Sequence, residues 1–166
     1  NTLSLIWHFK TQEGYSDWAG MGSHNLSVGD VDLDGRDELV YGNCAIDDDG
    51  TGLWTLRGSI GKATGDAMHL ADIVPEREGL EKWGCGEGSG PGAHLVDAGT
   101  GKPLWLTAPG DVGRATAGDL VAGSFGMECW GGTDGLRSAN NIKVGGKPSS
   151  INHVVWWDAD LGRELL

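Results

Sequence analysis

One short pattern occurs three times along the chain and constrains the fold more than any other feature. Each copy has an aspartate in a mostly small or apolar segment, then a glycine, then an acidic residue within a strand-like run. The three aspartates are Asp30, Asp72 and Asp119, which stand 42 and 47 residues apart. Repeats of this length are typical of units that each build one four-stranded antiparallel sheet. The chain is therefore predicted to be all-β.

The segments between the repeats carry hairpin signals rather than helical periodicity. A turn separates two apolar runs at residues 94–105, and the same arrangement returns at 156–166. We predict a partial β-propeller of roughly three to four blades, with residues 1–166 forming a fragment of a single propeller domain. Such a piece leaves two sheet edges unpaired, and the first residue is Asn1 rather than Met. The chain is therefore interpreted as part of a larger protein.

Residues 30–38 have the pattern of a loop that wraps a hard cation such as calcium. Carboxylates stand at loop positions one, three, five and nine, a glycine at position six turns the backbone, and position seven offers its carbonyl oxygen. The predicted ligands are Asp30, Asp32, Asp34, Glu38 and the carbonyl of Arg36. Like charges this close repel one another unless a cation neutralises them. The alternative is a solvated acidic turn, and the strict alternation favours calcium.

Other acidic groups give weaker signals. Asp72 and Glu81 take the equivalent positions in the second repeat and are candidates for a further ion, although that repeat lacks the DxDxDG core. Residues 47–49 are three consecutive aspartates, which form either another calcium loop or a solvated turn. Asp158 and Asp160 flank a single residue without the loop glycine and are assigned to a hairpin turn.

The composition excludes several classes of partner. Twelve Lys and Arg residues against 24 Asp and Glu residues give a net charge of −12, which opposes direct binding to nucleic acid and to acidic membranes. No apolar run reaches the ~20 residues that span a bilayer. Cys44, Cys85 and Cys129 are few and far apart, so they are predicted to be small buried hydrophobes rather than disulfide partners or metal ligands.

Several stretches, spread over nearly the whole chain, carry a resemblance to one enzyme family. They include GDAMH at 65–69 and also occur at residues 22–32, 41–42, 46–53, 111–114, 148–152 and 156–161. In these residues the chain resembles the rhamnogalacturonan lyases of polysaccharide lyase family eleven. The resemblance implies an eight-bladed β-propeller that holds several calcium ions and cleaves the rhamnose–galacturonate backbone of pectin by β-elimination.

The resemblance also implies a calcium ion in the active cleft. Family members contact that ion through two histidines, an aspartate and a glutamate, and the matching motifs place three of these at His24, Asp66 and Glu87. The second histidine precedes the aspartate by two residues, a position that holds Thr64 here. Of the other histidines, His69 is interpreted as supporting or structural.

β-Elimination makes two chemical demands on such a site. The substrate carboxylate has to be neutralised by calcium or an arginine, so that the enolate-like transition state is stabilised. A base near neutral pKa has to take the C5 proton, which suits a histidine. His24 is the candidate base, against the alternative of a histidine that is only hydrogen-bonded at the start of a strand. Arg114 is the candidate for binding the uronate carboxylate, against an ion pair with Asp111 or Asp119.

The sequence therefore predicts a secreted, calcium-dependent lyase that acts on the acidic polysaccharide rhamnogalacturonan I. Bound calcium explains how a chain with a net charge of −12 binds a polyanion. Little activity is expected of the isolated chain, because the rest of its propeller is missing. The alternative is a non-catalytic, calcium-stabilised propeller that binds carbohydrate or protein, as in integrin-like repeats. The DxDxDG loop fits both functions, whereas GDAMH and residues 148–152 favour the lyase and Thr64 favours the alternative.

Overall fold

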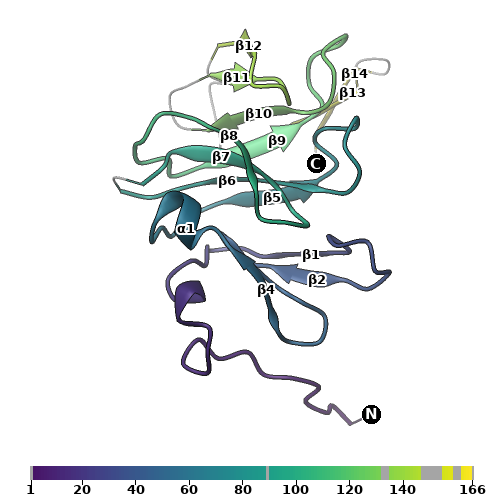
Figure 1. Ribbon diagram of the computed structural model, residues 1–166. Coiled ribbons are helices and arrows are strands. Elements are labelled where there is room, and N and C mark those ends of the chain that lie inside the picture. Colours follow the sequence, from purple (N-terminus) through teal and green to yellow (C-terminus); the bar gives the residue numbers. More distant parts are fainter. Residues whose placement is uncertain (1, 89, 132–134, 147–154, 159–161, 166) are drawn as a thin grey trace.

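A computed structural model describes residues 2–88, 90–131, 135–146, 155–158 and 162–165 of the chain (Figure 1). Residues 148–152 and Asp160, which the sequence singled out, lie outside the described residues. The described chain is mostly strand and turn, with one 3-10 helix, η1 (Ser16–Trp18), and one short α-helix, α1 (Arg57–Ile60). None of its helices is long and apolar enough to cross a membrane.

The described strands form three four-stranded antiparallel sheets and one two-stranded sheet. In each four-stranded sheet, strands that follow one another in the chain lie side by side, so the sheets are simple meanders. The first sheet contains β1 (Ser27–Gly29), β2 (Glu38–Val40), β3 (Cys44–Ile46) and β4 (Gly52–Thr55). The second contains β5 (Met68–Ala71), β6 (Glu81–Cys85), β7 (Ala93–Asp97) and β8 (Pro103–Leu106). The third contains β9 (Ala115–Gly118), β10 (Glu128–Gly131), β11 (Leu136–Arg137) and β12 (Lys143–Gly145), and β13 (Val155–Asp158) pairs with β14 (Gly162–Leu165).

Two apolar cores hold the three large sheets together. The second sheet lies between the first and the third (Figure 1), and its strand β6 is buried along its whole length. Met21, Val40 and Leu56 belong to the core that the first sheet shares with the second. Trp83 and Cys129 belong to the core that the second sheet shares with the third. Removal of this apolar surface from water is the main favourable contribution to folding.

Three tryptophans each bind a turn of the sheet that follows them in the chain. The indole N–H of Trp54, in β4, donates to the carbonyl oxygen of Ala98 at the end of β7, at 2.7 Å. Trp105, in β8, donates in the same way to Ala139 in the third sheet at 2.8 Å. Trp7 donates to the carbonyl of Asp48 in the first sheet at 2.7 Å. Since a covered indole N–H needs an acceptor, these bonds help to set how each sheet sits on its neighbour.

The three cysteines are buried free thiols, as predicted. Burial raises the pKa of each thiol, to about 12 for Cys44. A thiol that stays protonated is a poor nucleophile and a poor metal ligand, so these residues act as small apolar side chains.

The all-β prediction is confirmed, and each of the three repeats builds one four-stranded sheet. The prediction of a partial β-propeller, three to four blades of an eight-bladed ring, is wrong: the described chain forms separate antiparallel sheets, and none of them closes. The physical reason is that repeat length fixes how many strands one unit contains. The arrangement of whole sheets depends on side-chain packing between them, which repeat length does not specify.

Candidate functional site

Three chain segments that are distant in sequence meet at one point beside the first and second sheets. Ser23 and Gly65 form an isolated parallel bridge, so the residues that follow them, His24 and Asp66, start side by side. The backbone N–H of Glu87 donates to the carbonyl oxygen of Thr64 at 3.0 Å, which brings the third segment to the same place. Backbone contacts therefore set the position of each candidate ligand.

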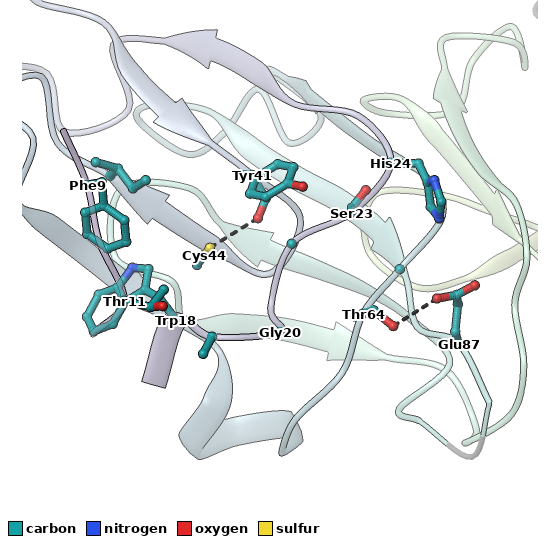
Figure 2. A pocket seen from close by; sticks show the side chains of 14 residues that line it. Phe9, Thr11, Trp18, Gly20, Ser23, His24, Tyr41, Cys44, Thr64 and Glu87 are labelled. Carbon is teal, nitrogen blue, oxygen red and sulfur yellow. Dashed lines mark hydrogen bonds between the residues drawn. The ribbon is translucent and has the colours of Figure 1, made fainter. Parts of the chain in front are cut away.

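The ligand atoms of His24, Asp66 and Glu87 all lie within 4.8 Å of one another. His24 Nε2 is 3.4 Å from Asp66 Oδ1. The group borders a cavity of about 770 Å³, and Figure 2 shows His24, Thr64 and Glu87 at one end of it and Phe9 and Trp18 at the other. The His24 side chain is 79% exposed, so a substrate in the cavity has access to its ring.

Arg114 lies next to this group. It stands immediately before β9, and its Nη1 donates to Asp66 Oδ2 at 2.8 Å. Neither Asp111 nor Asp119 pairs with it among the ion pairs of the described chain. Asp66 therefore lies between the imidazole of His24 and the guanidinium of Arg114, a contact that sequence reasoning did not identify.

Thr64 takes part in the site through its hydroxyl group. Its Oγ1 donates to Glu87 Oε2 at 2.9 Å, as Figure 2 shows. This bond holds the carboxylate of Glu87 toward the other two ligands. The sequence marked Thr64 only as the position of a missing histidine, and a 23-residue separation from Glu87 gives no local signal of the contact.

The DxDxDG loop gathers carboxylates into two overlapping groups. The ligand atoms of Asp30, Asp32 and Glu38 lie within 4.8 Å of one another, as do those of Asp34, Glu38 and Asp48. Asp48 comes from the β3–β4 turn, and the run of aspartates at 47–49 was the only signal for it. Arg36 contributes its side chain to this region as well, with Nη2 3.0 Å from Asp34 Oδ2 and Nη1 2.6 Å from Asp48 Oδ2.

The chemistry of this loop fits a hard cation. Asp30 Oδ1 and Glu38 Oε1 are buried and have no hydrogen-bond partner within the described chain. Burial raises the pKa of Glu38, two backbone N–H groups oppose that rise, and the nearby charges of Asp32 and Asp30 add to it. Buried carboxylate oxygens without donors are the ligands that calcium prefers.

Asp72 and Glu81 have different surroundings. Glu81 Oε2 accepts the backbone N–H groups of Ile73 and Val74 at 3.1 and 2.9 Å, and its Oε1 lies 3.5 Å from Arg77 Nε. Asp72 does not join Glu81 in any group of three potential ligands found among the described residues. The position of Asp72 and Glu81 thus has fewer potential ligands close together than either group in the DxDxDG loop.

His69 and His94 are not among the residues that line the pocket. His69 Nε2 is 3.1 Å from the carbonyl oxygen of Ala115, and burial lowers the pKa of its ring. His94 is fully buried, with Nε2 2.7 Å from Asn43 Oδ1 and 2.9 Å from Lys82 Nζ. His69 is thus half-buried in β5, and His94 is enclosed in β7.

The family model and the most similar known proteins point to the same family. Residues 1–166 match the family described as rhamnogalacturonan lyase family 11, C-terminal domain. The chain is 44% identical to rhamnogalacturonan exolyase YesX of Bacillus subtilis (strain 168) over 177 aligned residues, which cover 99% of this chain and 28% of that relative. It is 43% identical to rhamnogalacturonan endolyase YesW of the same organism, over 99% of this chain and 26% of the relative. The chain therefore spans little more than a quarter of the length of these relatives.

Solved structures agree with the sequence comparison. A Bacillus licheniformis rhamnogalacturonan lyase, PL11, superposes with a TM-score of 0.88 at 44% identity, over 99% of this chain and 28% of that one. The crystal structure of YesW superposes with a TM-score of 0.86 at 42% identity, over 97% of this chain and 28% of that one. The resemblance read from the sequence is confirmed: the chain belongs to rhamnogalacturonan lyase family 11, in the part of it that is described as the C-terminal domain.

Proposed function

We propose that this chain carries part of the active site of a lyase that cleaves rhamnogalacturonan I by β-elimination at galacturonate. The single observation that carries the proposal is the meeting of His24, Asp66 and Glu87 within 4.8 Å beside an accessible cavity. The relatives named above are rhamnogalacturonan lyases, which supports the same reaction and the same polymer. An extracellular location goes with this proposal, because so large a polymer does not cross a membrane.

In this proposal, His24 takes the C5 proton of the galacturonate. Its ring is exposed to the cavity, and Asp66 Oδ1 at 3.4 Å orients it and stabilises the imidazolium that forms. The hydroxyl of Thr64 keeps the carboxylate of Glu87 in place beside them. Calcium prefers oxygen ligands, so the carboxylates of Asp66 and Glu87 would hold the ion. His24 would lie beside it. When bound, the ion would neutralise the uronate carboxylate as a Lewis acid.

Arg114 binds the substrate carboxylate and also orients Asp66. A guanidinium has five N–H donors in a fixed plane, and the contacts of Arg114 within the described chain use only Nη1. Its side chain is 52% exposed, so the remaining donors reach a uronate at the pocket. A preorganised positive charge at that place lowers the energy of the enolate-like transition state.

The DxDxDG loop has a structural role in this proposal. Calcium held by Asp30, Asp32, Asp34 and Glu38 would pin the β1–β2 loop, which follows the segment that carries His24. The two unpartnered carboxylate oxygens in that loop support the proposal.

The test is the reaction of rhamnogalacturonan I with the intact protein, followed by the ultraviolet absorbance of the unsaturated uronate product. His24→Ala should lower kcat by about 10²- to 10⁴-fold, the usual contribution of a general base. His8→Ala, at an exposed position that is not among the residues lining the pocket, is the matched control and should leave kcat unchanged. Wild-type turnover in His24→Ala would refute the assignment of the base. A wild-type protein that binds the polymer but forms no unsaturated product would instead favour a non-catalytic, calcium-stabilised binding module.

A further inference from the structure

The two chain segments that carry His24 and Asp66 are linked by the side chain of one asparagine. Asn25 follows His24 directly, and Met68 stands two residues after Asp66, at the start of β5. Asn25 Nδ2 donates to the carbonyl oxygen of Met68 at 2.9 Å, and Asn25 Oδ1 accepts the backbone N–H of Met68 at 3.1 Å. The amide therefore pairs with both backbone groups of Met68, as a residue of a neighbouring strand would.

The parallel bridge between Ser23 and Gly65 is a second link between the same segments. Ser23 stands one residue before His24, and Gly65 one residue before Asp66. The two site residues thus lie between the bridge on one side and the Asn25 amide on the other. A single link fixes one point at which two segments meet, whereas two links also fix the direction in which they run.

Ser23 holds the Asn25 amide in this orientation. Ser23 is buried, and its Oγ donates to Asn25 Oδ1 at 3.1 Å. Oδ1 thus accepts from two donors while Nδ2 donates to a carbonyl oxygen. If the amide turned over, its oxygen and nitrogen would change places and bonds would be lost at both ends.

A third link between the segments lies in the core, at Asn43. Its backbone N–H donates to the carbonyl oxygen of Met21 at 2.7 Å, and its Nδ2 donates to that of Ala63 at 2.9 Å. Met21 and Ala63 each stand three residues before the site residue of their segment. Asn43 is buried, so its replacement would disturb the core, whereas Asn25 is exposed. Asn25 is therefore the residue at which the link can be removed with the core intact.

The place of the His24 ring depends on the backbone that carries it. The side chain is 79% exposed, so packing restrains it little, and its Nε2 lies 3.4 Å from Asp66 Oδ1. A change in the direction of the His24 backbone would move the ring relative to this carboxylate. At a reacting group, a displacement of about 1 Å can lower a rate by as much as 10²-fold.

We propose that Asn25 is a positioning residue, which sets the approach of His24 to Asp66 through its two hydrogen bonds to Met68. Asn25 is not among the residues that line the pocket, so it acts through His24 and not through the substrate. The effect of Asn25 on turnover rests on the function proposed above. Its effect on the surroundings of the His24 ring does not depend on the reaction.

The first test is kinetic and uses the intact protein with rhamnogalacturonan I. Asn25→Ala should lower kcat by about 10-fold or more and change KM by less than about twofold, because a displaced base acts in the transition state and not in substrate binding. In a His24→Ala background, the same substitution should lower kcat no further, because the group that Asn25 positions is gone. Thr107→Ala is the matched control and should keep the wild-type kcat. It removes a hydroxyl that accepts the backbone N–H of Ala93 at 2.9 Å and does not line the pocket.

The second test does not need the reaction. The ring signals of His24 in a proton–carbon NMR spectrum are identified by their loss in His24→Ala. In Asn25→Ala they should shift in the same direction as in Asp66→Asn, because both changes take a carboxylate charge away from the ring. Thr107→Ala should leave them unshifted.

The proposal is overturned if the His24 signals of Asn25→Ala coincide with those of the wild type, or if Asn25→Ala keeps the kcat of an active wild type. It is also overturned if Asn25→Ala lowers kcat by the same factor with and without His24, since the effect would then be a general loss of structure. Shifted His24 signals in a protein that forms no unsaturated product would count against the proposed function and support the positioning role.

Discussion

Lys82 is an ionisable side chain at full burial, and its titration gives a sharp test of the core between the first and second sheets. Its Nζ lies 2.7 Å from Asn43 Oδ1 and 2.9 Å from His94 Nε2, with the thiols of Cys44 and Cys85 nearby. Burial lowers the pKa of Lys82 from 10.5 to about 7. A difference of this size between folded and unfolded chain corresponds to about 5 kcal/mol against the charged form.

The sign of the pH effect follows from proton counts. Between about pH 7 and pH 10 the unfolded chain keeps the Lys82 proton while the folded chain has lost it, so the free energy of unfolding rises with pH. From pH 7 to pH 8.5 this amounts to about 2 kcal/mol. The window ends there because the raised pKa values of Cys44, Cys85 and Cys129 lower stability as the unfolded thiols ionise. It begins at pH 7 because His94, whose pKa is lowered by burial and by Lys82, adds its own effect at lower pH.

Lys82→Met removes the titrating group and keeps the length of the side chain. We expect urea unfolding, followed by tryptophan fluorescence at fixed saturating calcium, to give a flat free energy of unfolding from pH 7 to pH 8.5 in this variant. The exposed Lys102→Met is the control and should keep the wild-type slope. The reasoning is refuted if the wild type shows no rise across this window, or if Lys82→Met retains the rise.

Three further predictions concern the site, the calcium loop and a tight turn. Asp66→Asn should lower kcat/KM on rhamnogalacturonan I by about 10²-fold or more, because it removes a charge beside the reacting groups; unchanged kinetics would contradict its role. Chelation of calcium should lower the melting temperature, and Asp32→Asn should shrink that shift in calorimetry; an equal shift in the variant would exclude the DxDxDG loop as its origin. Gly126→Ala should destabilise the chain by about 2 kcal/mol or more, since φ is 73° and the added Cβ would meet the carbonyl oxygen of Ile73. Gly123→Ala, with φ 80° but open space around it, should lose only about 1 kcal/mol in the same urea titration.

The strand pattern was accessible from the sequence because it is local. Glycine turns and short apolar runs fix where strands begin and end, and the spacing of Asp30, Asp72 and Asp119 fixes how many strands share a sheet. The packing of one sheet on the next is a long-range property. It depends on contacts such as the Trp54 N–H on the carbonyl of Ala98, which are 44 residues apart. For this reason the all-β class was predicted correctly and the ring arrangement was not.

The candidate site was predictable in part, and only through the family resemblance. Composition and spacing give no reason for His24 and Asp66, 42 residues apart, to meet; the bridge between Ser23 and Gly65 brings them together. Asp48 joins the DxDxDG loop from a different turn, which a nine-residue motif cannot reveal. Arg77 carries no motif at all, because a guanidinium near a buried glutamate has no sequence pattern of its own.

The hydrogen bond from the Trp54 indole N–H to Ala98 concerns the same junction of sheets as the candidate site. His24 precedes the first sheet and Asp66 precedes the second, so the bridge between Ser23 and Gly65 joins the two sheets at the same place where it sets the candidate site. Trp54 lies in the core between the same two sheets, and its indole N–H joins them through the carbonyl oxygen of Ala98. Where each sheet packs on its neighbours, a substitution of this ring acts mainly on the junction between the first and second sheets. We therefore expect a substitution of Trp54 to change the junction that carries His24 and Asp66, although Trp54 is not among the residues that line the pocket.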